Sequence, residues 1–195
     1  MAEIKTALEI ALERTRDIKG DRTSLEAKEY RERGLKLLAR AEAEPELDIK
    51  KELSSYKGQQ LSWVHEGLRQ NLLGVLALPS GPEALDRLAA LAKVFVALSV
   101  KPKDMQQLLN DAGEFFKKYL EDRDHLFEAV LRQYEPALRQ KEEAMARQTG
   151  RHVRINPEQD PEYNAFLKKN LDGLTTQYQA VVDKLKQEVE SRLAD

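Results

Sequence analysis

The chain contains no cysteine among its 195 residues. This absence excludes disulfide bonds, thiolate nucleophiles and cysteine-ligated metals together. It also fits a reducing cytoplasm, which is the compartment we expect. Glycine and proline are scarce, with nine and seven residues, so few positions can interrupt a helix.

The sequence also lacks an apolar run long enough to cross a bilayer, which needs about 20 residues. Its start lacks the apolar stretch of a signal peptide, because Glu3, Glu9 and Glu13 interrupt it. The formal net charge is only -2, so no overall field draws the chain to nucleic acid or anionic lipid. We therefore expect no membrane partner, and nucleic acid is not the partner we favour.

Catalytic signatures are missing as well. The glycines form neither a Gly-x-Gly-x-x-Gly nor a Gly-x-x-x-x-Gly-Lys phosphate loop. No serine lies in a Gly-x-Ser-x-Gly elbow. We expect no cofactor and no enzymatic activity.

What the sequence does contain is apolar residues at helical spacing along almost its whole length, together with 34 % charged residues, above the roughly 25 % of an ordinary domain. This pattern predicts an all-α fold, an elongated helical bundle of five to seven helices with long coiled-coil-like C-terminal helices. We expect one helical domain over residues 1–195, in which Gly20 ends the first helix and a capping box at Thr23–Glu26 starts the second. The predicted helices span residues 3–19, 24–44, 46–78, 83–99, 103–148 and 161–193.

Three glycines lie inside the third predicted helix. Gly67 and Gly74 are seven residues apart and share a face, which favours close approach of a neighbouring helix, whereas Gly58 can be a break. Residues 83–99 are apolar nearly all round, which is typical of a helix near the centre of a bundle.

The last predicted helix carries an apolar seam with steps of four and three residues, the period of a helix that packs on a partner helix. Trp63 is a second candidate contact, because tryptophan often anchors interfaces. These features predict a non-enzymatic helical scaffold or regulatory protein that acts through helix–helix contacts. Its partner is either itself, as a homo-oligomer, or another helical protein. The seam consists of Leu167, Leu171, Leu174, Tyr178, Val181 and Leu185.

Two alternatives depend on other residues. A nucleic-acid-associated protein would use the basic loop over residues 147–154, where the candidate anion-binding residues are Arg147, Arg151, His152 and Arg154. A metal-dependent helical enzyme would use Asp122 and His125, three residues apart on one helix. The matching motif on a second helix is missing, so we expect no metal site.

The opening segment EIKTALEIALERT, residues 3–15, resembles the start of a family of uncharacterised bacterial helical proteins. The resemblance covers about the first forty residues. It implies a bacterial, cytoplasmic protein and carries over no functional residues.

Overall fold

A computed structural model describes the backbone of residues 7–193 and the side chains of residues 23–193. The described chain folds into six α-helices and one short 3-10 helix, and no strand occurs within residues 7–193. The all-α prediction of five to seven helices is therefore confirmed. The helices are α1 (Ala7–Ala43), α2 (Ile49–Leu53), α3 (Gln59–Val75), α4 (Glu83–Leu98), α5 (Pro102–Thr149) and α6 (Pro161–Arg192), with η1 (Pro157–Gln159) before α6.

The chain divides into two compact units. Unit 1 contains residues up to 75, residues 90–106 and the chain end from residue 190, whereas unit 2 contains residues 76–89 and 107–189. Helices α4, α5 and α6 each contribute residues to both units. The single helical domain over residues 1–195 stays a prediction.

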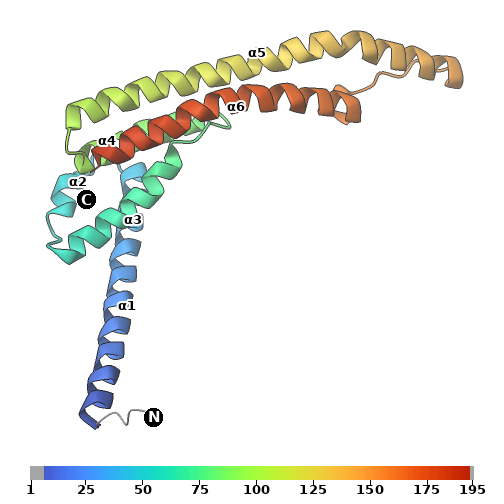
Figure 1. Cartoon of the computed structure of the whole chain (residues 1–195). Helices are drawn as coiled ribbons and strands as arrows, with labels where there is room; N and C mark the ends of the chain where they lie inside the picture. The colour runs from blue at the N-terminus through green and yellow to red at the C-terminus, as the bar shows by residue number, and fades with distance from the viewer. Residues whose placement is uncertain (1–6, 194–195) are drawn as a thin grey trace. The chain divides into compact units, whose positions relative to one another are not determined.

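In unit 1, α1 and α3 pack closely against one another (Figure 1). Gly34 of α1 and Gly67 of α3 are both buried at this crossing. A Cβ atom built on Gly67 would lie 2.8 Å from the Cα of Arg31, and one built on Gly34 would lie 3.2 Å from the backbone nitrogen of Leu68. The close approach predicted for Gly67 is confirmed. Gly74 does not take part, because nothing lies within 4 Å of its Cβ position.

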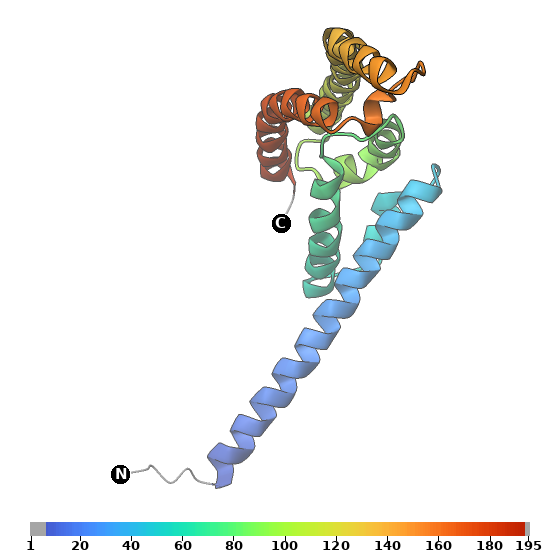
Figure 2. The ribbon, with the colours of Figure 1, turned by 90° about the vertical axis from the view of Figure 1, so that its right-hand side faces the viewer.

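The boundaries of the first helices differ from the prediction. Figure 2 shows α1 as one helix, where we expected one helix over residues 3–19 and another over 24–44. Gly20 does not end it, since an interior glycine costs only about 1 kcal/mol relative to alanine. The expected start at residue 3 lies outside the described residues.

The predicted helix over residues 46–78 is instead divided into α2 and α3. Gly58 has a φ of 55°, in the left-handed region that glycine adopts without steric cost. It lies in the break between the two helices, as the sequence allowed.

Helix α4 supplies buried side chains to both units. Leu88 belongs to unit 2, whereas Leu91, Val94, Phe95 and Leu98 belong to unit 1. Phe95 is the largest fully buried side chain among the described residues. The other face of α4 carries exposed residues such as Asp86 and Arg87, so the helix is less completely surrounded than its sequence suggests.

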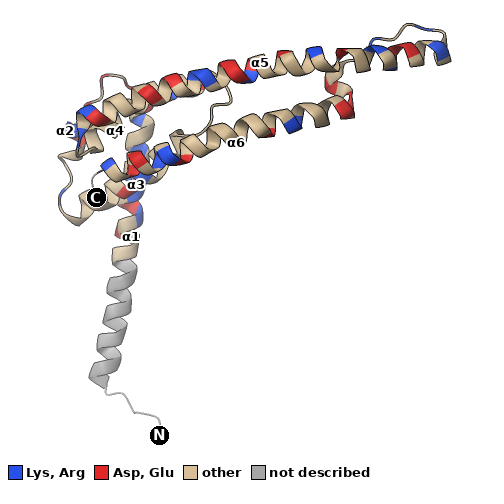
Figure 3. Cartoon of the chain, turned by 45° about the horizontal axis from the view of Figure 1, so that its top comes forward, with Lys and Arg blue, Asp and Glu red and all other residues tan. Residues whose placement is uncertain are grey.

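In unit 2, α5 and α6 form an antiparallel hairpin, joined by the loop that contains η1 (Figure 1). Ring contacts show that the two helices run in opposite directions, because Tyr178 contacts Phe115 near the start of α5, whereas the earlier Tyr163 contacts Tyr134 farther along α5. Both acidic and basic residues occur on each helix, more densely on α5 than on α6 (Figure 3), and such charges are typical of solvated helix faces.

Candidate functional site

An aromatic cluster holds the two helices of the hairpin together. The ring of Tyr178 lies 5.0 Å from the rings of both Phe115 and Tyr119, measured between centroids. Its hydroxyl donates a hydrogen bond of 2.5 Å to the carboxylate of Asp122, which also accepts one from Lys118. Burial, together with the bond to Asp122, raises the pKa of Tyr178 to about 12. The hydrogen bonds from Tyr178 and then from Lys118 lower the pKa of Asp122.

Beside this cluster, an open apolar groove of about 390 Å³ runs between α5 and α6. Its apolar lining comes from both helices, and the side chain of Val181 is 46 % exposed although it belongs to the predicted seam. Charged residues of both signs complete the lining. The groove is lined by Leu108, Asp111, Ala112 and Phe115 of α5 and by Val181, Lys184, Leu185 and Glu188 of α6.

The predicted seam is divided between this hairpin and solvent. Tyr178 packs against α5, and Val181 and Leu185 line the groove. The other three seam residues, Leu167, Leu171 and Leu174, are half-buried. The fully buried positions of α6 within unit 2 include Val182 and Val189. The most deeply buried face of α6 therefore lies next to the predicted seam.

Trp63 lies elsewhere, in unit 1. Its ring stacks on Tyr30 with the ring centroids 6.1 Å apart, and Tyr56 meets Tyr30 edge to face at the same distance. Trp63 is half-buried in this cluster between α1 and α3. Its intramolecular packing gives it a role in joining these helices, and its part in binding another chain stays a prediction.

A polar cluster at the far end of the hairpin was not predicted. The carboxylate of Asp160, with only 4 % of its side chain exposed, accepts a hydrogen bond of 2.6 Å from the ammonium group of Lys141. Its second oxygen accepts from the backbone nitrogens of Glu162 and Tyr163 and so caps α6. Lys141 also lies 2.8 Å from the carboxylate of Glu162 and donates to the hydroxyl of Tyr134. The sequence signal for this cap was an aspartate followed by proline at a helix start.

The charged groups of this cluster shift one another's pKa values. The hydrogen bond from Lys141 lowers the pKa of Asp160 and also that of Glu162, and Asp160 in turn raises the pKa of Lys141. A lowered carboxyl pKa stabilises the fold above the unfolded value of about 3.9, and this stabilisation is lost as the pH falls through the folded value. A raised lysine pKa stabilises the fold fully below the unfolded value of about 10.4. This stabilisation is lost as the pH rises from that value through the folded one.

We therefore expect Asp160→Asn to unfold at lower temperature than the wild type near pH 7, with a difference that shrinks below about pH 4. Asparagine keeps an oxygen that can cap the helix, so the variant mainly removes the charge. Thermal unfolding followed by circular dichroism across pH measures this. Glu128→Gln, which breaks the exposed pair between Glu128 and Arg132, serves as control and should change little. Equal melting of wild type and Asp160→Asn at neutral pH would contradict the expected effect.

The predicted anion-binding residues are all exposed. Three of them, Arg147, His152 and Arg154, line a pocket of about 530 Å³ together with Arg139, Glu142, Glu143, Ala146 and Val153. Arg151 is not among the lining residues.

The residues considered for a metal do not form a cluster. Asp122 accepts hydrogen bonds from Tyr178 and Lys118, and His125 is exposed. Within the described residues, no group of three or more histidine, aspartate and glutamate side chains is arranged to hold a metal ion.

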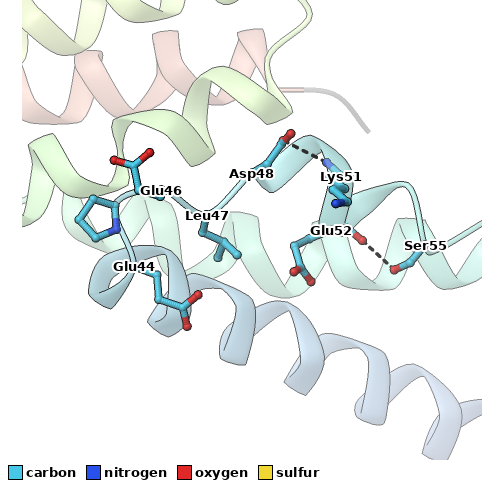
Figure 4. A pocket seen from close by; sticks show the side chains of 8 residues that line it. Glu44, Glu46, Leu47, Asp48, Lys51, Glu52 and Ser55 are labelled. Atoms are coloured by element: carbon cyan, nitrogen blue, oxygen red, sulfur yellow. Dashed lines mark hydrogen bonds between the residues drawn. The ribbon is translucent and has the colours of Figure 1, made fainter.

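A third pocket, of about 780 Å³, lies in unit 1 beside the turn from α1 to α2 (Figure 4). It is rich in carboxylates, but these have partners nearby. Glu44 and Glu52 both pair with Arg40, and Asp48 accepts from the backbone nitrogen of Lys51 as the cap of α2. These contacts give the pocket a structural role, because they fix the path of the chain between the two helices.

None of the helices within residues 7–193 combines the length and apolar character that a membrane span requires. This finding agrees with the distribution of charge along α5 and α6 in Figure 3.

Comparison with known proteins gives a family but no function. No curated protein and no solved structure matches the chain. A model of a family of unknown function, DUF6657, matches residues 50–191. The uncharacterised family that the sequence suggested is thus confirmed, although the match covers a different part of the chain from the first forty residues. Because the matched segment is most of the chain, the protein belongs to the family of unknown function DUF6657.

Proposed function

We propose that this protein is a non-enzymatic helical scaffold or regulatory protein that associates with a second copy of itself through the apolar groove between α5 and α6. The observation that carries the proposal is the exposure of Val181 beside a groove whose lining is mostly apolar. Covering apolar surface stabilises an association by roughly 25 cal/mol per Å². A contiguous apolar site bordered by charged residues is typical of a protein interface.

The charges around the groove support a second copy as the occupant. Lys184 lies among the lining residues with Asp111 and Glu188. In a two-fold dimer the same surface meets itself, so Lys184 of each copy can face an acidic residue of the other. Val181 and Leu185 are four residues apart on one face of α6 and supply the apolar centre. With a net charge of only -2, two copies repel each other weakly.

The metal-dependent enzyme has less support, since the carboxylate of Asp122 is engaged by the aromatic cluster. The cytoplasm is the compartment we propose, because a chain without cysteine needs no oxidising environment. Its bacterial origin stays a prediction from the resemblance.

The self-association predicts a mass above 22.3 kDa for the wild type at micromolar concentration. We expect Val181→Asp to shift the equilibrium toward the monomer by at least tenfold in Kd, because a buried unpaired carboxylate costs on the order of several kcal/mol. Sedimentation equilibrium over a range of concentrations measures this. Circular dichroism should show an unchanged helix content, because Val181 is exposed within the chain.

Leu131→Asp is the matched control. Leu131 is 42 % exposed on α5 and does not line the groove, so the same chemical change there should leave the mass unaltered. A wild-type protein that stays at 22.3 kDa at all concentrations would refute self-association. If Leu131→Asp dissociated the oligomer as strongly as Val181→Asp, the interface would lie outside the groove.

A further inference from the structure

The loop after α5 brings basic side chains from two segments into one pocket. Arg139 and Arg147 project from α5, whereas His152 and Arg154 belong to the extended segment that follows it. The backbone nitrogen of Ile155 donates a hydrogen bond of 2.8 Å to the carboxylate of Glu142 and ties that segment back to α5. Figure 3 shows basic residues at the end of α5 and in the loop beyond it.

The basic groups of this pocket differ in their internal partners. Arg139 pairs with Glu135 at 2.5 Å, and Arg147 lies 3.7 Å from Glu143, a long and exposed pair. Within the described side chains, no hydrogen bond or ion pair engages His152 or Arg154. Exposed ion pairs contribute little stability, so Arg147 can exchange Glu143 for another anion at small cost.

The carboxylates in the lining do not cancel this charge. Glu142 accepts the hydrogen bond from Ile155, and that bond satisfies part of its capacity as an acceptor. The carboxylate of Glu143 lies 3.7 Å from the guanidinium of Arg147. The guanidinium of Arg154, which no described side chain engages, is therefore available to an incoming anion, with Glu143 as the carboxylate that competes with that anion for Arg147.

We propose that this pocket binds phosphate groups, with Arg147 and Arg154 as the principal ligands. The planar guanidinium fork matches two phosphate oxygens at once and forms short charge-assisted hydrogen bonds. The pocket has a volume of about 530 Å³, far more than a single water molecule needs. It therefore accommodates a ligand with several phosphate groups, either a small polyphosphate compound or the backbone of a single-stranded nucleic acid.

The test uses the full-length protein with inorganic pyrophosphate, followed by calorimetry at low ionic strength. We expect Arg154→Gln to weaken pyrophosphate binding about tenfold, and Arg147→Gln with Arg154→Gln together to abolish it, because each removes a charge-assisted contact. Glu143→Gln should have the opposite effect and tighten binding several-fold, because it removes a competing anion. All three positions are exposed, so folding should be retained and is checked by circular dichroism.

Two controls change the net charge equally but outside the pocket. Arg132→Gln and Glu128→Gln alter an exposed pair on α5 and should leave pyrophosphate affinity unchanged.

An RNA oligomer of mixed sequence forms the second arm of the experiment. RNA affinity far above that of pyrophosphate, with the same dependence on Arg154, would assign the phosphates to nucleic acid, and comparable affinities would assign them to a small ligand.

Two results would overturn the phosphate site. One is the absence of binding to both pyrophosphate and RNA at low salt. The other is an equal loss of affinity in Arg132→Gln and Arg154→Gln, which would show that only the overall charge matters. Neither result bears on the groove, because the two surfaces share no lining residue.

Discussion

Replacing Gly67 by alanine should destabilise unit 1 by at least about 2 kcal/mol, although alanine is the better helix former. The added methyl group would lie 2.8 Å from the Cα of Arg31 and closer still to the carbonyl oxygen of that residue. These are backbone atoms, so no side-chain rotation relieves the overlap, and α1 must move away from α3. Gly34→Ala should act in the same direction, since its methyl group would meet the backbone carbonyl of Val64.

Urea unfolding followed by the fluorescence of Trp63 measures this effect locally. Trp63 is the chain's single tryptophan and stacks on Tyr30 between the same two helices. Gly74→Ala in α3 is the matched control, because nothing lies within 4 Å of its Cβ position. It should stabilise the protein by about 0.5–1 kcal/mol through the lower entropy of the unfolded chain. Equal stabilisation by Gly67→Ala and Gly74→Ala would show that α1 and α3 do not meet closely.

The comparison of these glycines shows what the sequence could predict. Spacing alone put Gly67 and Gly74 on one face, and only Gly67 lies at a crossing. Which of two equivalent positions meets a neighbour depends on where α1 lies, and a single sequence carries no direct signal for that. Gly58 was easier to interpret, because a positive φ is a local property that glycine permits.

The predicted helix boundaries were wrong where they depended on weak local signals. Gly20 and the capping box at Thr23–Glu26 each alter helix stability by only about 1 kcal/mol. Helix α1 packs against α3, its residues Leu37, Leu38 and Ala41 are buried, and helices in proteins derive most of their stability from tertiary contacts. A continuous α1 is the result.

The candidate site was predicted in part. The period of the last helix predicted a seam that contains Tyr178, and the ring of Tyr178 does contact α5. The groove itself could not be predicted, because it needs Leu108, Ala112 and Phe115 to lie opposite α6. The cluster of Lys141, Asp160 and Glu162 was missed for the same reason, since Lys141 is separated from Asp160 by 19 residues.

The other large effect is expected at Tyr178. Tyr178→Ala should cost about 2–4 kcal/mol, because it removes the ring that packs on Phe115 and Tyr119. Tyr178→Phe keeps the ring and loses only the hydrogen bond to Asp122, so it should cost about 1–2 kcal/mol. Tyr56→Phe is the control, because within the described side chains the hydroxyl of Tyr56 makes no hydrogen bond. Urea unfolding at pH 7 followed by circular dichroism ranks the three variants.

Measuring the unfolding free energy at alkaline pH separates the packing of Tyr178 from its ionisation. The folded pKa of about 12 exceeds the ordinary value of about 10. The phenol therefore stabilises the fold fully below pH 10, and this contribution is lost as the pH rises toward 12. The difference in unfolding free energy between wild type and Tyr178→Phe should accordingly shrink over that interval, and a constant difference would contradict the raised pKa that burial and the bond to Asp122 give Tyr178.

Val181 lies one turn along α6 from Tyr178, and we propose the opposite role for it. Tyr178 holds the hairpin together within one chain, whereas Val181 is 46 % exposed and faces solvent. Tyr178→Ala should therefore lower stability in a protein held monomeric by Val181→Asp just as it does in the wild type. If instead Tyr178→Ala dissociated the oligomer without lowering the stability of the monomer, the ring would belong to the interface between chains, and the groove would extend farther along α6 than its present lining.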